Sequence, residues 1–370
     1  MLLPFSPTRW FSAVLLSLFL FSCGNEEEQI PHNIIYLIGD GMSYAQVTAA
    51  EYEFGSLNMT STPYSGSIFT HSADARVTDS AASGTALSSG YKTNNGMLAM
   101  LPDGTPLQTI AHYASEIGKS TALMATCRIT HATPASFAVH HEARGDEFII
   151  AEKFVDSGID MLLGAGWRYF LPEAEGGERP DDRNLIAEME EMGYLYIDDE
   201  NELHQMEGQD QVIAFLEANN LQRYPQRGDQ VNRLTQAALD QLSRNPEGFF
   251  MMIEGAMIDW GGHANDPEYM LNEMKDFDNV IGDVLEFAEA DGNTLVVITA
   301  DHETGGLTLT SGSEGSFEYS WSTGGHSGVQ VPVYSYGPSA DLFSGTYDNT
   351  EVARKMFGLW GKSPHRADNR

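Results

Sequence analysis

Acidic and histidine side chains follow several apolar segments of this 370-residue chain. Carboxylate oxygens and imidazole nitrogens, without thiolates, suit zinc and magnesium ions held in open catalytic sites. Each residue alone also has an ordinary explanation as a turn residue, a helix cap or a polar group of a loop. The recurrence of the pattern favours a metal site. Its candidate ligands are Asp40, Glu254, Asp259, His263, Asp301, His302 and His326.

Two pairs among these candidates depend on the local backbone. Asp259 and His263 are four residues apart in a segment with two glycines, which we expect to be a loop that bends both side chains toward one ion. Asp301 and His302 are adjacent and would point to opposite faces of a continuing strand. Both can reach one ion only if the strand ends there, and the Glu-Thr-Gly-Gly that follows indicates that it does.

A run of very small residues at 76–90, "RVTDSAASGTALSSG", offers a nucleophile. Its alanines and leucine permit a short helix beginning at Ser80. Free N–H groups and the helix dipole at that end favour negative charge, which suits an alkoxide or a phosphate. Asp79 or Ser80 can equally be a simple helix cap, and Ser/Gly runs are also common in flexible linkers.

A histidine-rich segment at 127–144, "CRITHATPASFAVHHEAR", follows a predicted strand. His131, Thr133 and Arg144 are its candidate site residues. His140 and His141 have weaker claims, because such histidines more often belong to the surface or the core.

The predicted elements place these residues at one edge of a sheet. Apolar strands are predicted at 33–38, 120–126, 211–217, 249–255, 294–300 and 329–337, with another apolar run near 160, and helices at 105–117, 184–192, 232–243 and 267–291. Strands of continuous Ile, Val, Leu and Met that alternate with helices predict an α/β fold: a single large three-layer αβα domain with a mostly parallel central sheet. Ligands bind beyond the carboxyl ends of such strands, where nearly every candidate lies.

The termini predict export. Residues 1–22 have one positive charge and then an apolar run, as in a signal peptide. Cys23 ends that run as in a bacterial lipobox, so we expect a lipid anchor at the bacterial outer membrane; the alternative is an ordinary signal peptide with an incidental cysteine. The expected parts are a tether at 23–32, a catalytic domain at 33–362 with an insert near 165–245, and a polar tail at 363–370. A lipidated Cys23 leaves only Cys127, so no internal disulfide forms.

The net charge of −33 makes nucleic acid and anionic membrane surfaces poor partners. The membrane is then expected as a partner only through the lipid. An anionic substrate would need strong positive charge within the site.

Six stretches together resemble the alkaline phosphatase family: "IIYLIGDGM", "RVTDSAASGTALSSGYKTNNG", "ITHATPASFAVHHEAR", "FFMMIEGAMIDWGGHAND", "NTLVVITADHETGG" and "STGGHSGVQVPVYSYGP". They are in the family's order from residue 34 to 338. The resemblance implies a phosphomonoesterase acting on small phosphate esters, with Ser80 as the residue that becomes phosphorylated and Arg144 as the arginine that binds two phosphate oxygens.

The resemblance also implies two zinc ions and one magnesium ion. Its ligand sets are Asp259, His263 and His326 for one zinc, Asp40, Ser80, Asp301 and His302 for the other, and Asp40, Thr133 and Glu254 for magnesium. The positions of His131 and Trp260 vary within the family and affect the third metal. The short stretch between His302 and His326 implies a reduced crown region, which weakens the inference of a homodimer.

Two alternatives remain open from the sequence. One is a phosphodiesterase of the same superfamily, because pocket width cannot be derived from the motifs. The other is a surface lipoprotein that binds phosphate without turnover, against which the intact Ser80 argues.

Overall fold

The computed structural model describes Met1 and residues 29–363. The predicted signal peptide at 1–22, the lipidation site Cys23, residues 24–28 of the tether and residues 364–370 of the tail lie outside the described residues and stay predictions. Within the described part of the chain, no helix is both long enough and apolar enough to span a bilayer.

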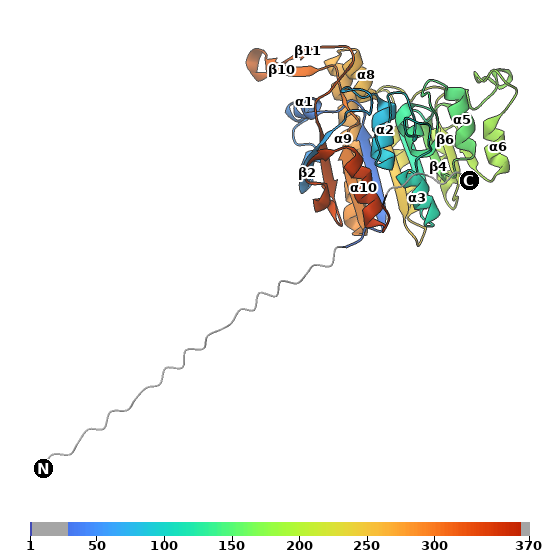
Figure 1. The fold of residues 1–370 in the computed structure, drawn as a ribbon, viewed down its shortest axis with the longest axis horizontal. Helices are drawn as coiled ribbons and strands as arrows, with labels where there is room; N and C mark the ends of the chain where they lie inside the picture. Colours follow the sequence, from blue (N-terminus) through green and yellow to red (C-terminus); the bar gives the residue numbers. More distant parts are fainter. Residues whose placement is uncertain (2–28, 364–370) are drawn as a thin grey trace.

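A ten-stranded sheet forms the centre of the domain (Figure 1). Its order is β14-β2-β13-β8-β1-β7-β3-β4-β6-β5, and every strand except β13 runs parallel to the others. The central strands are buried along their whole length, which explains their unbroken apolar sequences. The strands are β1 (Asn33–Gly39), β2 (Tyr64–Phe69), β3 (Ser120–Arg128), β4 (Met161–Ala165), β5 (Leu195–Ile197), β6 (Val212–Phe215), β7 (Phe249–Gly255), β8 (Thr294–Thr299), β13 (Val331–Tyr336) and β14 (Gly345–Asp348).

Helices cover both faces of this sheet, so the predicted three-layer α/β domain is confirmed. One layer contains α2 (Ser80–Ser89), α3 (Ile110–Glu116), α4 (Ala132–Ala138) and α10 (Thr350–Leu359), which pack on one another. The other contains α1 (Tyr44–Phe54), α7 (Gln230–Leu242), α8 (Met257–His263) and α9 (Pro267–Asp291). Two further helices, α5 (Glu147–Val155) and α6 (Leu185–Glu191), contact each other.

The ends of two helices show how the sequence sets their bounds. α9 begins as predicted, since the Asp266 side chain accepts a hydrogen bond from the Tyr269 N–H and Pro267 stands at its first position. The prediction that a helix begins at 105 was wrong: α3 begins at Ile110, because the Thr109 hydroxyl caps it by accepting from the His112 N–H at 3.2 Å.

The segment that contains Asp259 and His263 is also not the predicted loop. It forms helix α8, which continues through both of its glycines. Gly261 and Gly262 lie against the backbone of Met270 and Thr304, where a Cβ atom would clash. The glycines therefore serve close packing rather than bending, and the four-residue spacing places both side chains on one helical face.

A short hairpin stands between His302 and His326. It consists of β10 (Leu307–Ser311) and β11 (Phe317–Trp321) and projects at the upper edge of the domain in Figure 1. Two further short strands, β9 (Glu303–Thr304) and β12 (His326–Ser327), pair antiparallel with His326 opposite Thr304. This pairing brings His326 back to the carboxyl end of β8.

The segment 165–245 extends one side of the sheet. It supplies β5 and β6, which continue the order beyond β4, together with α6 and α7. The other side ends in β2 and β14, which reach the parallel strands through the single antiparallel strand β13.

Candidate metal centre and active site

The candidate ligands meet at the carboxyl edge of the sheet. Asp40 follows β1, Glu254 lies in β7, and Asp301 and His302 follow β8. These four side chains are fully buried. Because adjacent parallel strands end at the same edge, residues more than 200 positions apart in the sequence become neighbours.

Ser80 lies against the first group of donors. His302 Nε2 is 3.0 Å from Asp301 Oδ2, 3.4 Å from Asp40 Oδ1 and 3.2 Å from the Ser80 hydroxyl. Both carboxylate oxygens of Asp40 and the Oδ2 of Asp301 are buried and make no hydrogen bond to any described residue. Bare carboxylate oxygens facing one another beside an imidazole fit a divalent cation.

A second group contains two histidines and Asp259. His263 Nε2 is 3.3 Å from Asp259 Oδ2 and 3.2 Å from His326 Nε2, and His326 Nε2 is 3.6 Å from Asp259 Oδ1. The Nδ1 atoms of the two rings lie 2.7 Å from the Gly324 carbonyl and 2.9 Å from the Thr78 carbonyl. When each Nδ1 donates to its carbonyl, both Nε2 atoms present lone pairs to the same point, as metal-bound histidines do.

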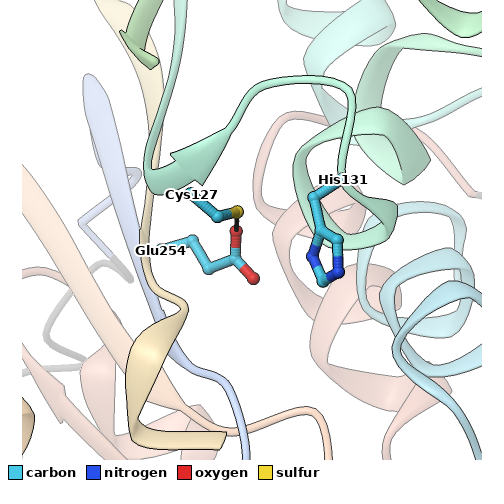
Figure 2. Close-up of side chains that lie close together, drawn as sticks. All are labelled: Cys127, His131 and Glu254. Atoms are coloured by element: carbon cyan, nitrogen blue, oxygen red, sulfur yellow. Dashed lines mark hydrogen bonds between the residues drawn. The ribbon is translucent and has the colours of Figure 1, made fainter. Parts of the chain in front are cut away.

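A third group lies around Glu254 (Figure 2). The Oε1 of Glu254, the hydroxyl of Thr133 and the Nδ1 of His131 are buried without a hydrogen-bond partner in the described chain. Cys127, which the sequence did not single out, places its Sγ 3.4 Å from the other oxygen of Glu254. One donor atom each from Cys127, His131 and Glu254 lie within 4.8 Å of one another.

The pKa values show that burial and neighbouring negative charges disfavour the ionised form of some of these carboxylates. Burial, together with the charge of Asp301, raises the pKa of Asp40 well above its ordinary value and that of Glu254 to about 7. Hydrogen bonding to Asp259 raises the pKa of His263 to about 9. Although burial opposes it, the ion pair with His302 lowers the pKa of Asp301. Carboxylates this close repel one another, so the residues fit bound cations.

Ser80 is the first residue of α2, as the sequence predicted. Asp79 caps that helix by accepting from the Ala82 N–H at 3.0 Å. All ten residues of α2 are buried, and a Cβ atom at Gly84 would overlap the Ser136 hydroxyl of α4. The very small residues therefore let α2 pack tightly between its neighbours, with its positive end at the cluster of donors.

Arg144 reaches the same place from the segment after α4. Its guanidinium lies 3.1 Å from the second oxygen of Asp79 and 3.2 Å from His131 Nε2. Asp79 also accepts from the Gly96 N–H, so one carboxylate caps α2 and orients Arg144. Trp260 packs edge-on to His131, with ring centroids 6.3 Å apart.

Two of the histidines considered in the sequence lie away from the site. The His140 ring stacks on that of His112 and its Nε2 contacts the Leu107 carbonyl at 2.7 Å. His141 Nε2 is 2.9 Å from the Asp146 carboxylate. These contacts give both histidines structural roles, in agreement with the lower rank that the sequence gave them as site residues.

Sequence reasoning missed two residues that touch the donors. The Thr304 hydroxyl donates to Asp259 and lies 3.3 Å from His302 Nδ1, which links the first two groups. Its position two residues after His302 was the available signal. Cys127 gave only its rarity as a signal, since the sequence holds one other cysteine.

Comparisons with known proteins agree with this geometry. The sequence profile of the alkaline phosphatase family matches residues 31–317 and 313–360. Alkaline phosphatase 3 of Bacillus subtilis is 33% identical over 90% of this chain and 89% of its own length. The alkaline phosphatase of Escherichia coli is 30% identical over 89% of this chain and 86% of its own.

Solved structures of alkaline phosphatases resemble this chain as well. The alkaline phosphatase of the Antarctic bacterium TAB5 superimposes with a TM-score of 0.85 at 35% identity, covering 90% of this chain and 98% of that one. A variant of that enzyme is described with magnesium bound in its M3 site. With its three-layer fold, its clustered metal-binding side chains and these relatives, the chain belongs to the alkaline phosphatase family and is a phosphoric monoester hydrolase.

Proposed function

We propose that this enzyme hydrolyses small phosphate monoesters through a phosphoserine intermediate on Ser80, with two zinc ions and a third divalent ion. The observation that carries the proposal is the contact of the Ser80 hydroxyl, at 3.2 Å, with His302 inside a group of bare carboxylates. A structural serine has no need of such neighbours.

The donor sets support two zinc ions. Asp259, His263 and His326 would hold one, and Asp40, Asp301 and His302 with Ser80 the other, since carboxylate and imidazole donors are typical zinc ligands. The oxygens of Asp40, Thr133 and Glu254 would contribute ligands to the third ion, and these oxygens taken alone would suit magnesium.

Phosphate-monoester hydrolysis needs more than acid–base catalysis. Enzymes accelerate such reactions by up to roughly 10²¹-fold, whereas general acids and bases typically contribute about 10²–10⁴-fold. When bound, paired divalent ions lower the pKa of a coordinated hydroxyl and stabilise the attacking and leaving oxygens of an in-line displacement.

The chain's own residues orient the reaction. The Ser80 oxygen loses its proton and attacks phosphorus, and the bond to the ester oxygen breaks on the opposite side, where that oxygen takes up a proton and leaves as the alcohol. Arg144, held by Asp79 at 3.1 Å, is placed to bind two phosphate oxygens with its planar guanidinium. The N-terminus of α2 adds positive potential at the serine that carries the phosphoryl group. Water then attacks the phosphoserine and releases inorganic phosphate.

The test is hydrolysis of an aryl phosphate at alkaline pH, before and after chelation and after zinc and magnesium are restored. Ser80→Ala is expected to abolish turnover and to retain bound metal. Ser89→Ala is the matched control, because it removes another buried hydroxyl from the far end of α2. Full activity in Ser80→Ala would refute the nucleophile, and a diester turned over faster than the monoester would refute the substrate class.

We also propose that the enzyme is exported and anchored by lipid on Cys23 to the bacterial outer membrane. The apolar run that ends at Cys23 and the polar residues after it support this. Incorporation of labelled palmitate that is lost in Cys23→Ser tests the anchor, and cell fractionation tests the location. Light scattering on the purified protein decides between monomer and homodimer.

A further inference from the structure

Cys127 contributes a donor that the oxygen set for the third ion does not include. It is the penultimate residue of β3, its side chain is fully buried, and its Sγ lies 3.4 Å from Glu254 Oε2. His131, the residue before α4, turns its ring toward the two (Figure 2). Sulfur, nitrogen and carboxylate donors thus converge from three separate positions of the chain.

Unsatisfied polar atoms at the same place point to a ligand independently of the cysteine. Glu254 Oε1, Thr133 Oγ1 and His131 Nδ1 are all buried and find no hydrogen-bond partner among the described residues. Each such atom costs about 1–3 kcal/mol when left unpaired. A cation at their centre would satisfy all three.

We propose that Cys127, His131 and Glu254 bind a zinc-class transition ion, so that the third cation site of this chain takes Zn²⁺ in preference to Mg²⁺. This inference rests on the proposed function only for the presence of a third ion. Zn–S and Zn–O bonds of about 2.3 and 2.0 Å at the tetrahedral angle separate sulfur from oxygen by about 3.5 Å. The Cys127 thiol donates a hydrogen bond to Glu254 Oε2 across 3.4 Å. This separation is close to that edge of a zinc tetrahedron, so Zn²⁺ can replace the thiol proton with little movement of either atom.

Magnesium fits the same donors poorly. It demands octahedral oxygen ligands and keeps several of its waters, whereas thiolate selects softer ions. Trp260 packs on the small apolar cluster of Ala125, Cys127 and Ala256 and so covers the sulfur side of the site. A tetrahedral ion, which needs few waters or none, suits this covered position better.

Binding at His131 also affects Arg144. A metal on Nδ1 requires the ring proton on Nε2, which then cannot accept a hydrogen bond. The contact of 3.2 Å between Arg144 and Nε2 would be released, and the guanidinium would keep its bond to Asp79. The arginine is thereby freed on the side of the site where phosphate binds.

Cobalt(II) is the probe, because thiolate bound to cobalt gives a strong charge-transfer absorption in the near ultraviolet. The full chain is stripped of metal, loaded with cobalt and measured as wild type, Cys23→Ser and Cys127→Ser. Cys23→Ser is the matched control, since it leaves Cys127 as the only thiol in the sequence. We expect the thiolate band in wild type and in Cys23→Ser, and its loss in Cys127→Ser.

Metal analysis after equilibration with equal zinc and magnesium is the second measurement. We expect three zinc ions in Cys23→Ser, and two zinc and one magnesium in Cys127→Ser. Three bound cobalt ions without a thiolate band in Cys23→Ser, or magnesium as the third ion in that variant, would overturn the proposal even if Cys127→Ser fails to fold. If the cobalt-loaded Cys23→Ser protein hydrolyses the aryl phosphate but shows no thiolate band, only the assignment of Cys127 as a ligand is refuted. If it shows the band but does not hydrolyse the ester, Cys127 is supported as a ligand and the proposed function is refuted.

Discussion

Removing the charge of Glu254 should stabilise the metal-free protein at neutral and alkaline pH. Glu254 is fully buried in β7, and burial, with the charge of Asp301, raises its pKa from 4.5 to about 7. A carboxyl with a raised pKa binds its proton more tightly when folded, so stability falls as pH rises from 4.5 through about 7. The shift corresponds to about 3 kcal/mol above pH 7, which Glu254→Gln would recover.

Urea denaturation of chelator-stripped wild type and Glu254→Gln between pH 4.5 and 8.5 measures this effect. The two proteins should be about equally stable at the lowest pH and diverge as pH rises, with the variant more stable by about 3 kcal/mol at pH 8. Glu289→Gln, at an exposed position of α9, should follow wild type throughout. After metal is restored the order should reverse, because the charge then binds a cation. The reasoning would be refuted if metal-free Glu254→Gln were less stable than wild type at pH 8, or if the difference in stability between the two proteins did not change with pH.

Three further outcomes are expected. Gly84→Ala should lower the free energy of unfolding by about 1–3 kcal/mol, because the added methyl group would overlap the Ser136 hydroxyl of α4. Gly358→Ala in α10 is the control: its methyl group meets open space, so this variant should be as stable as wild type or more stable. Thermal unfolding measures both variants. Arg227→Met should lower the free energy of unfolding, measured in urea, by about 3–5 kcal/mol, because it leaves the buried carboxylates of Glu273 and Asp276 in α9 without their cation. Arg183→Met, which removes a surface ion pair, should lower it by about 1 kcal/mol or less. Arg144→Lys should raise KM for an aryl phosphate more than it lowers kcat, because lysine cannot bind two oxygens in the same plane.

The sequence predicted the layers of the fold because buried parallel strands and their covering helices have distinct patterns. The strands at 33–38, 249–255 and 294–300 are nearly the observed β1, β7 and β8. Helix α10 also has a clear signal in the sequence, because Val352, Ala353, Met356 and Phe357 lie on one buried stripe. The opposite direction of β13 could not be derived, since apolar residues fill a buried strand in either direction.

The local backbone at the site was harder to predict than its residues. Two glycines in succession ordinarily favour a loop, but in α8 they are required by close packing against Met270 and Thr304. The hydroxyl that links two groups of donors, that of Thr304, depends on the pairing of β9 with β12, which only the folded chain shows. Motif spacing identifies which residues could act, and long-range pairing decides which atoms meet.

The acidic composition and an anionic substrate are compatible only through the cations of the site. In a chain whose net charge is −33, four of the 53 acidic side chains, those of Asp40, Glu254, Asp259 and Asp301, are buried together in the site. Without metal they would repel phosphate despite Arg144 beside them. The three proposed divalent ions would exceed the charge of four carboxylates, and a thiolate at Cys127 would still leave the site positive. The carboxylates that repel one another in the metal-free protein therefore give the metal-bound site its attraction for phosphate. Each carboxylate strengthens the binding of a divalent cation, and the cation carries more positive charge than the carboxylate carries negative charge.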